Sequence, residues 1–165
     1  MMSARSELVT DAAIAIVATE GMRELTHRAV DELANLPIGS TSNVYRSREQ
    51  LLIGISGRLS EKVHEMSGRA SARADYLNAL LSTGNHALHA LTVILLDGSM
   101  PRSVQLAARA TVDEITGTVQ RLSPRSIETP GLIIGMLITQ LVNGSRDASE
   151  IERFLSSVSS QKAAL

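Results

Sequence analysis

The segment over residues 25–52, LTHRAVDELANLPIGSTSNVYRSREQLL, limits the possible folds more than any other part of the chain. Thr26 is a good N-cap for a helix over His27–Ala34, which carries small and branched apolar side chains on one face. Asn35 stands where this helix must stop, because Asn tolerates the left-handed conformation common at helix ends. Pro37 then opens a second helix, since a missing N–H costs nothing at the first helical position. The segment therefore predicts two short helices joined by a tight turn.

The predicted second helix, Pro37–Tyr45, has an unusual outer face. At about 100° per residue, the side chains expected to face inward are those of Ile38, Thr41 and Tyr45. The opposite side carries Gly39, Ser40 and Asn43, with Val44 at their flank. Such small polar groups suit a helix that approaches another polar surface closely, and Asn pairs bidentately with adenine in the major groove. An exposed helix of poor propensity is the alternative interpretation.

A third helix begins with a capping box, in which Ser47 is the N-cap and Gln50 reaches back from the third helical position. The arginines on either side of Ser47 therefore lie beside a helix N-terminus, where backbone N–H groups already favour an anion. The preceding helix starts in the same way. Base-reading side chains flanked by phosphate contacts at helix starts are typical of a helix-turn-helix. The residues predicted to hold phosphates are Thr26, Arg28, Ser42, Arg46 and Arg48.

Several residue groups along the first third of the chain share one known pattern. They are Asp11-Ala12-Ala13, Glu20-Gly21, Leu25-Thr26-His27-Arg28, Gly39-Ser40-Thr41-Ser42-Asn43, Tyr45 and Ser47-Arg48-Glu49. Over roughly Val9 to Leu59 the chain thus resembles the DNA-binding domain of the TetR family of bacterial transcriptional regulators. Two positions depart from the family pattern: Asn35 stands where the family usually has Gly, and Val44 replaces a common Tyr or His. The second departure removes a frequent phosphate or base contact.

The resemblance implies an N-terminal helix-turn-helix DNA-binding domain, residues 1–46, and a helical ligand-binding and dimerisation domain, residues 47–165. A helix over residues 47–67 would connect the two, so that a tilt of this helix moves the reading helix. The expected partners are a palindromic double-stranded DNA operator, a small-molecule effector and a second copy of the chain, in the bacterial cytoplasm. The residues expected to contact DNA are Thr26, Arg28, Gly39, Ser40, Ser42, Asn43, Val44, Arg46 and Arg48.

Composition favours an all-α fold. The 165 residues are 44% hydrophobic but only 2% aromatic, so Ala, Leu, Ile and Val must fill the core, which favours closely packed helices. No long Val/Ile/Thr alternation predicts a strand. The absence of cysteine excludes disulfides and cysteine-ligated metal. No apolar run is long enough to span a bilayer, so no membrane contact is expected.

Charge alone does not indicate a nucleic-acid partner. The net charge is −1, and residues 1–66 hold seven Lys and Arg against nine Asp and Glu. Between Ala34 and Arg48, however, there are two arginines and no acid. This distribution predicts a small basic footprint on a mildly acidic molecule, and modest affinity per protomer, which makes two protomers useful.

Beyond Gly68 the pattern is one of successive helices without a specific motif. The expected helices are Asp75–Ser82, His86–Leu96, Met100–Leu122 and one starting at Pro130. By family resemblance this region should enclose a mostly apolar effector cavity. Its candidate ligand contacts are the scattered polar groups His86, His89 and Asp97. A packed core would use the same apolar residues.

The segment Gly131–Val142, GLIIGMLITQLV, is apolar nearly all round, although a surface helix of a small monomer should show one polar face. The final predicted helix, Ala148–Ser157, carries an apolar stripe. Two such helices from each of two chains would form a four-helix bundle, which is how the TetR family dimerises. The expected interface residues are Leu132, Ile133, Met136, Leu137, Phe154 and Leu155.

Catalysis has no support in the sequence, and no catalytic residue, cofactor or metal is expected. Glu61 and His64 have the Glu-x-x-His spacing of di-iron bundles, but the second copy and further carboxylates are missing. His86 and His89 lack a third ligand. The leading hypothesis is a dimeric, ligand-responsive repressor of the TetR type. The alternative is a helical ligand-binding or interaction protein whose DNA-binding head is vestigial.

Overall fold

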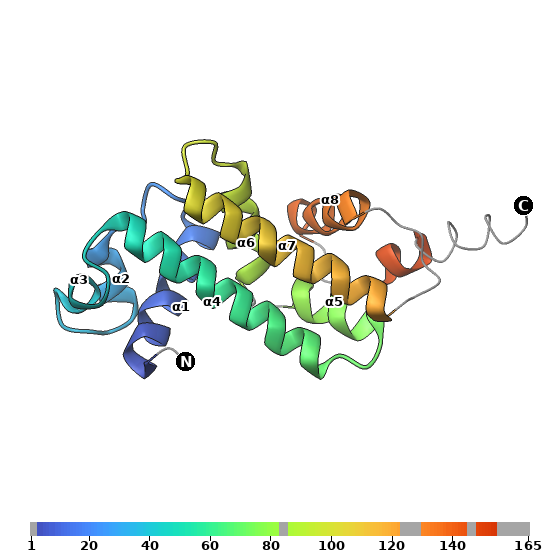
Figure 1. Cartoon of the computed structure of the whole chain (residues 1–165), viewed down its shortest axis with the longest axis horizontal. Helices are drawn as coiled ribbons and strands as arrows, with labels where there is room; N and C mark the ends of the chain where they lie inside the picture. Colours follow the sequence, from blue (N-terminus) through green and yellow to red (C-terminus); the bar gives the residue numbers. More distant parts are fainter. Residues whose placement is uncertain (1–2, 83–85, 123–129, 145–147, 155–165) are drawn as a thin grey trace, which may run out of the picture. The chain divides into compact units, whose positions relative to one another are not determined.

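Every regular element in the described part of the chain is a helix, which confirms the all-α prediction. The computed structural model describes residues 3–82, 86–122, 130–144 and 148–154 (Figure 1). The helices are α1 (Ala4–Thr19), α2 (His27–Leu33), α3 (Ser40–Val44), α4 (Arg48–Arg69), α5 (Arg73–Leu81), α6 (Ala87–Leu96), α7 (Arg102–Leu122) and α8 (Pro130–Val142). None of these helices is long and apolar enough to cross a membrane.

The contacts divide the chain into two compact units. The first unit comprises residues 1–62 and 86–110, and the second comprises residues 63–85 and 111–165. Helices α4 and α7 run through both units, while α6 belongs with the N-terminal helices. Helix α6 is part of the first unit because it packs on α1.

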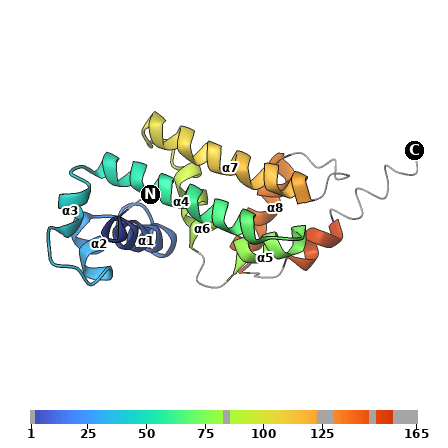
Figure 2. The ribbon, with the colours of Figure 1, turned by 60° about the horizontal axis from the view of Figure 1, so that its bottom comes forward.

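Helix α1 forms the centre of the first unit. It begins at the N-cap Ser3, whose side chain accepts a hydrogen bond from the backbone N–H of Ser6 at 3.2 Å. Helix α1 packs against α2 on one side and α6 on another (Figures 1 and 2). Fully buried side chains such as Val17 of α1 and Ile94 of α6 fill this core. Of the two helices expected to bind DNA, α2 therefore packs on α1, and α3 packs on α2.

A charged cluster ties α4 to α1 within the first unit. Arg58 donates to both carboxylate oxygens of Asp11, at 2.9 and 3.1 Å, and to Glu61 at 3.2 Å. Partial burial opposes ionisation of Asp11, but hydrogen bonds from Arg58 and Lys62 outweigh it and lower the pKa of Asp11. The bidentate geometry fixes the orientation of both side chains. The cluster therefore sets how α4 lies against α1.

Tyr45, which follows α3, anchors the end of that helix to α1 and α4. Its hydroxyl lies 2.7 Å from the hydroxyl of Ser6 in α1. Its ring covers Gly54 of α4 so closely that an added Cβ would lie 2.5 Å from the ring carbon Cζ. Tyr45 therefore packs inside the first unit, as the stripe of inward-facing residues predicted.

In the second unit, α4 and α7 run parallel, because polar contacts join residues 50 and 51 positions apart along the chain. His64 Nδ1 lies 2.8 Å from a carboxylate oxygen of Glu114, and the hydroxyls of Ser67 and Thr118 lie 2.8 Å apart. Arg73 of α5 makes a bidentate ion pair with Glu152, at 2.8 and 2.9 Å. This pair holds the helical residues 149–154 against α5.

Helix α8 has one face that its own protomer covers. Ile133 and Leu137 are fully buried and Gln140 is 6% exposed. The prediction that Ile133 and Leu137 form a dimer interface is therefore wrong, because these side chains pack into their own unit. Leu132 and Met136 are half-buried, and Phe154 is 42% exposed. Leu155 lies outside the described residues.

Two glycines in α4 should respond oppositely to substitution by alanine. Gly54→Ala should cost about 1–3 kcal/mol of stability, because the new methyl group displaces the Tyr45 ring. Gly57→Ala should stabilise the chain by about 0.5–1 kcal/mol, because a Cβ there meets nothing within 4 Å. Urea unfolding of both variants measures the difference. Equal stabilisation by both substitutions would show that Tyr45 does not pack on α4.

Candidate DNA-binding surface

Helix α3 starts three residues later than the sequence predicted. It spans only Ser40–Val44, and its N-cap Gly39 has the left-handed backbone angle φ = 92°. Pro37 and Ile38 therefore belong to the turn before the helix, where the N–H of Ser40 donates to the carbonyl of Pro37 at 3.0 Å. Glycine adopts this conformation without strain, which explains its presence at position 39.

Asp31 of α2 determines where α3 begins. One carboxylate oxygen of Asp31 accepts from the N–H of Gly39 at 2.7 Å. The other accepts from the N–H and the hydroxyl of Thr41, at 2.7 and 2.6 Å. A carboxylate at a helix N-terminus satisfies donors that have no partner within the helix. A side chain from one helix of the motif thus caps the other.

The environment of Asp31 keeps it ionised. Its side chain is only 1% exposed, and this burial by itself would raise the pKa. The hydrogen bonds from Thr41 and Gly39 outweigh the burial, with a smaller contribution from the charge of nearby His27, and the net pKa of Asp31 is lowered. The sequence signal for this role was an acidic residue next to Val30, on the apolar side of α2, where a carboxylate needs several donors.

His27, at the other end of α2, holds the C-terminal end of α3. Its Nε2 lies 2.8 Å from the carbonyl oxygen of Tyr45, so this nitrogen carries the proton and donates. Between the two contacts, α2 ends in the predicted left-handed turn, with Asn35 at φ = 52°. There the N–H of Leu36 donates to the carbonyl of Asp31 at 2.9 Å, which closes the helix end. Helix α3 is therefore fixed at both ends by α2.

The residues that α3 presents to solvent differ from those predicted. Ser42 and Asn43 are exposed, as expected, and Val44 is half-buried. Ser40 was predicted to face the bases, but it is 5% exposed and its hydroxyl donates to the carbonyl of Pro37 at 2.6 Å. Ile38 was predicted to face inward, but it is 77% exposed. The later start of the helix explains the error for Ile38, which lies in the preceding turn, whereas Ser40 is in the first turn of α3 and its hydroxyl is bonded to the turn before the helix.

The predicted phosphate contacts fall into two groups: exposed side chains, and Arg48, whose guanidinium binds backbone carbonyls. Thr26 and Arg46 are exposed; the Thr26 hydroxyl accepts from the N–H of Ala29 at 3.1 Å and keeps its own proton for another acceptor. Arg28 is exposed and forms an ion pair with Glu32 along its own helix at 2.9 Å. Such an exposed surface pair is weak and can rearrange.

Arg48 has a structural role in place of the predicted one. Its guanidinium donates to the carbonyls of Met22 and Leu25, and so braces the connection between α1 and α2. The predicted cap at the start of α4 is present, since Ser47 accepts from the N–H of Gln50 at 3.1 Å. The side chain of Gln50 accepts from the N–H of Arg46 at 2.8 Å, one residue earlier than a standard capping box requires.

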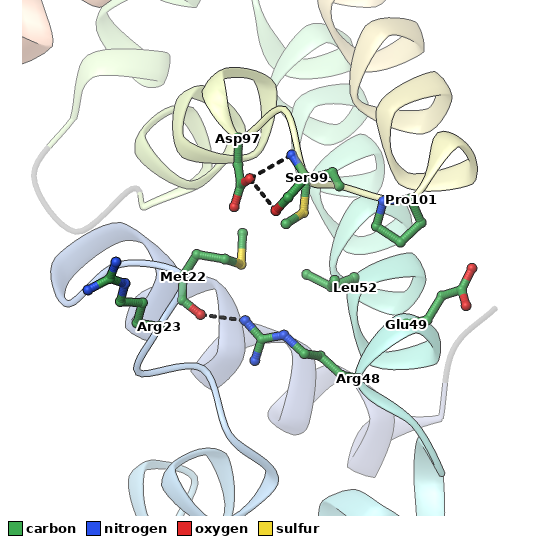
Figure 3. A pocket seen from close by; sticks show the side chains of 9 residues that line it. Met22, Arg23, Arg48, Glu49, Leu52, Asp97, Ser99 and Pro101 are labelled. Atoms are coloured by element: carbon green, nitrogen blue, oxygen red, sulfur yellow. Dashed lines mark hydrogen bonds between the residues drawn. The ribbon is translucent and has the colours of Figure 1, made fainter.

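The three candidate ligand contacts do not share one site. His86 and Asp97 flank α6 at opposite ends, 11 residues and so about 16 Å apart along its axis. His89 lies near the start of α6, and His86 and His89 are both partly exposed. Asp97 instead lines an open cleft in the first unit (Figure 3). Within the described ranges, no group of three or more His, Cys, Asp or Glu residues could hold a metal ion.

Comparison with known proteins establishes the fold. The chain matches no family model and no curated protein sequence. It is similar to the crystal structure of the multidrug binding protein EbrR complexed with malachite green, with 15% identity, a TM-score of 0.63 and coverage of 95% of this chain and 98% of that chain. The EbrR complex with imidazole matches with 16% identity, a TM-score of 0.64 and coverage of 94% and 95%.

The chain therefore shares the all-α fold of these two EbrR structures over nearly its whole length. At about 15% identity the likeness concerns the fold alone. The functional argument therefore depends on this chain's own residues.

Asp31→Asn should reduce stability by about 1–3 kcal/mol at pH 7, because the amide accepts fewer of the α3 donors. The contribution of a carboxylate with a lowered pKa is present above its unfolded pKa and disappears as pH falls through the folded pKa. The gap between wild type and variant should therefore narrow below about pH 4. Urea unfolding from pH 7 to pH 3 measures it, with the exposed Asp113→Asn as control. A gap independent of pH would contradict the ionised cap.

Proposed function

We propose that this chain is a transcriptional regulator of the TetR type that binds a palindromic operator as a dimer, with α3 in the major groove. The observation that carries the proposal is the double attachment of α3 to α2 through Asp31 and His27. This attachment orients a short helix whose solvent side carries Ser42 and Asn43. A fixed helix with small polar outer residues can approach base edges closely.

Base reading is assigned to Asn43, Ile38 and Ser42. Asn43 can pair bidentately with adenine, and an exposed apolar side chain such as Ile38 can contact a thymine methyl group. Ile38 replaces Ser40 in this assignment, because Ser40 is buried and its hydroxyl is already bonded. Gly39 contributes the conformation of the turn, and its N–H is bonded to Asp31.

Phosphate binding is assigned to Arg46, Arg28 and Thr26, which flank α3 and are exposed. Arg46 lies between the end of α3 and the N-terminus of α4, where the positive end of the helix dipole favours an anion. No acidic residue lies between Ala34 and Arg48, so no carboxylate of this segment repels the DNA phosphates. Arg48 is left out, since its guanidinium binds backbone carbonyls.

Dimerisation is assigned to the face of α8 opposite Ile133 and Leu137. Half-buried apolar side chains flank this face, among them Leu132, Ile134 and Ile138, and Gly135 allows close approach of a second helix. A self-complementary patch of this kind suits a two-fold dimer. The two copies of α3 would then contact half-sites centred about 34–36 Å apart, one turn of DNA.

Release from DNA is assigned to a small-molecule effector, by analogy with a neighbour described as a multidrug binding protein. The effector would bind in the second unit and act through α4 and α7, which run through both units. A repressor controlled in this way acts in the bacterial cytoplasm.

The alternative function is a helical ligand-binding protein without DNA binding. It is favoured by the excess of acidic residues in positions 1–66 and by the internal use of Arg48. Titration with a generic duplex at several salt concentrations separates the two, because each phosphate contact contributes about 0.9 to the slope of log K against log salt. A slope near zero would favour the alternative.

Asn43→Ala and Arg46→Ala should impair DNA binding in different ways. On a site selected from a random duplex pool, Asn43→Ala should cost about 1–3 kcal/mol, with little loss on random DNA. Arg46→Ala should weaken binding to both and lower the salt slope by about one unit. Fluorescence anisotropy measures both quantities.

The matched controls are Asn143→Ala, at the end of α8, and Arg69→Ala, at the opposite end of α4 from Arg46. Both should bind like wild type. Equal losses on selected and random DNA for Asn43→Ala would show that Asn43 does not read bases.

Ile138→Glu should convert the dimer into a folded monomer, because it places a charge on the outer face of α8. Leu106→Glu is the control, since Leu106 is 56% exposed on α7 and lies outside the proposed interface. Light scattering at micromolar concentration, with circular dichroism for helix content, gives the outcome. A wild-type monomer, or dissociation caused by Leu106→Glu, would rule out the α8 interface.

A further inference from the structure

An open cleft of about 640 Å³ lies within the first unit, away from the exposed face of α3. Its walls come from the α1–α2 connection, the first two turns of α4 and the connection between α6 and α7 (Figure 3). The volume lies in the range of about 300–1,000 Å³ typical of small-molecule sites. The proposed DNA contacts use none of its lining residues.

The cleft has an apolar lining that can adapt to a ligand. Met22 and Met100 line the cleft with thioether side chains, and Leu52, in the second turn of α4, adds an aliphatic one. Met100 is 8% exposed and Leu52 is 3% exposed, so both form the floor of the cleft. Methionine side chains are flexible and polarisable, which suits contact with aliphatic groups of varied shape.

Two residues of opposite charge, Asp97 and Arg48, line the cleft beside these apolar side chains. One carboxylate oxygen of Asp97 accepts from the N–H and hydroxyl of Ser99, at 2.9 and 2.6 Å, which leaves the other oxygen for a ligand. These bonds, together with the more distant charge of Arg48, lower the pKa of Asp97 and keep it ionised. Arg48 is fixed opposite by the carbonyls of Met22 and Leu25.

The other charged lining residues do not fill the space between this pair. Figure 3 shows the side chains of Arg23 and Glu49 directed away from the gap between Asp97 and Arg48. A cation alone would pair with Asp97 but be repelled by Arg48, and an anion alone would meet the reverse. A ligand carrying both charges satisfies both groups.

We propose that this cleft binds a small zwitterion with an apolar side chain, of which a neutral α-amino acid is the simplest case. Its ammonium group would pair with Asp97, its carboxylate with Arg48, and its side chain would lie against Met22, Met100 and Leu52. The bound ligand would link the α6–α7 connection, through Asp97, to the start of α4, through Arg48. Arg48 is itself bonded to the α1–α2 connection. This site is independent of the proposed DNA contacts and of any effector in the second unit.

Methionine methyl NMR tests the proposal directly. Of the six methionines, Met22 and Met100 line the cleft, whereas Met66 and Met136 do not and serve as internal references. Leucine should shift the Met22 and Met100 signals of the full chain saturably and leave the references unchanged. Its singly charged analogues, 3-methylbutylamine and 4-methylpentanoate, should bind at least about tenfold more weakly, about 1.4 kcal/mol.

The Asp97→Asn variant distinguishes charge pairing from simple apolar binding. It should weaken leucine at least about tenfold and leave 4-methylpentanoate bound as tightly as before, or more tightly, because a repulsive charge has gone. Asp113→Asn, an exposed substitution of the same kind, should change neither. Absence of any leucine-dependent shift at Met22 and Met100, or equal binding of the amine and leucine, would overturn the proposal. Because DNA is absent, this result is separate from the test of DNA binding.

Discussion

The buried carboxylate of Asp31 is the interaction on which the proposed DNA-binding surface depends. It accepts three hydrogen bonds from Gly39 and Thr41 at a site only 1% exposed, and so links α2 to the first residues of α3. A helix as short as α3 is not stable alone, because forming the first turn is unfavourable. The capping bonds from a neighbouring helix, together with His27 at the other end, supply the missing constraint. The orientation of the exposed side chains follows from these contacts.

Two further side chains, Tyr45 and Arg48, connect this surface to the rest of the first unit. Tyr45 follows α3; its hydroxyl contacts Ser6 of α1 and its ring packs on Gly54 of α4. Arg48 joins the start of α4 to the carbonyls of the α1–α2 connection. A shift of α4 therefore acts on the segments before and after the helix-turn-helix, through side chains that are already bonded to it. This gives a physical route by which a shift of α4 would reach the proposed DNA contacts.

Local sequence signals predicted the elements whose causes are local. Thr26 and Asn35 have the predicted roles at the ends of α2, because capping depends on residues within a few positions. The start of α3 was mispredicted, because it depends on Asp31, eight residues away from Gly39. Similarly, a helix as apolar as α8 indicates burial on both sides but not which side belongs to its own protomer, so Ile133 was placed at an interface and lies in the core.

The central claim is that the outer face of α3 and the residue that follows it contact DNA. The most direct measurement is a titration of the isotopically labelled full chain with duplex DNA, followed through backbone amide signals. We expect the largest changes at Ser42, Asn43 and Arg46, with the amides of the second unit, such as Gly117, unchanged at low saturation. Changes that avoid the α3 region, or no change at low salt, would contradict the claim.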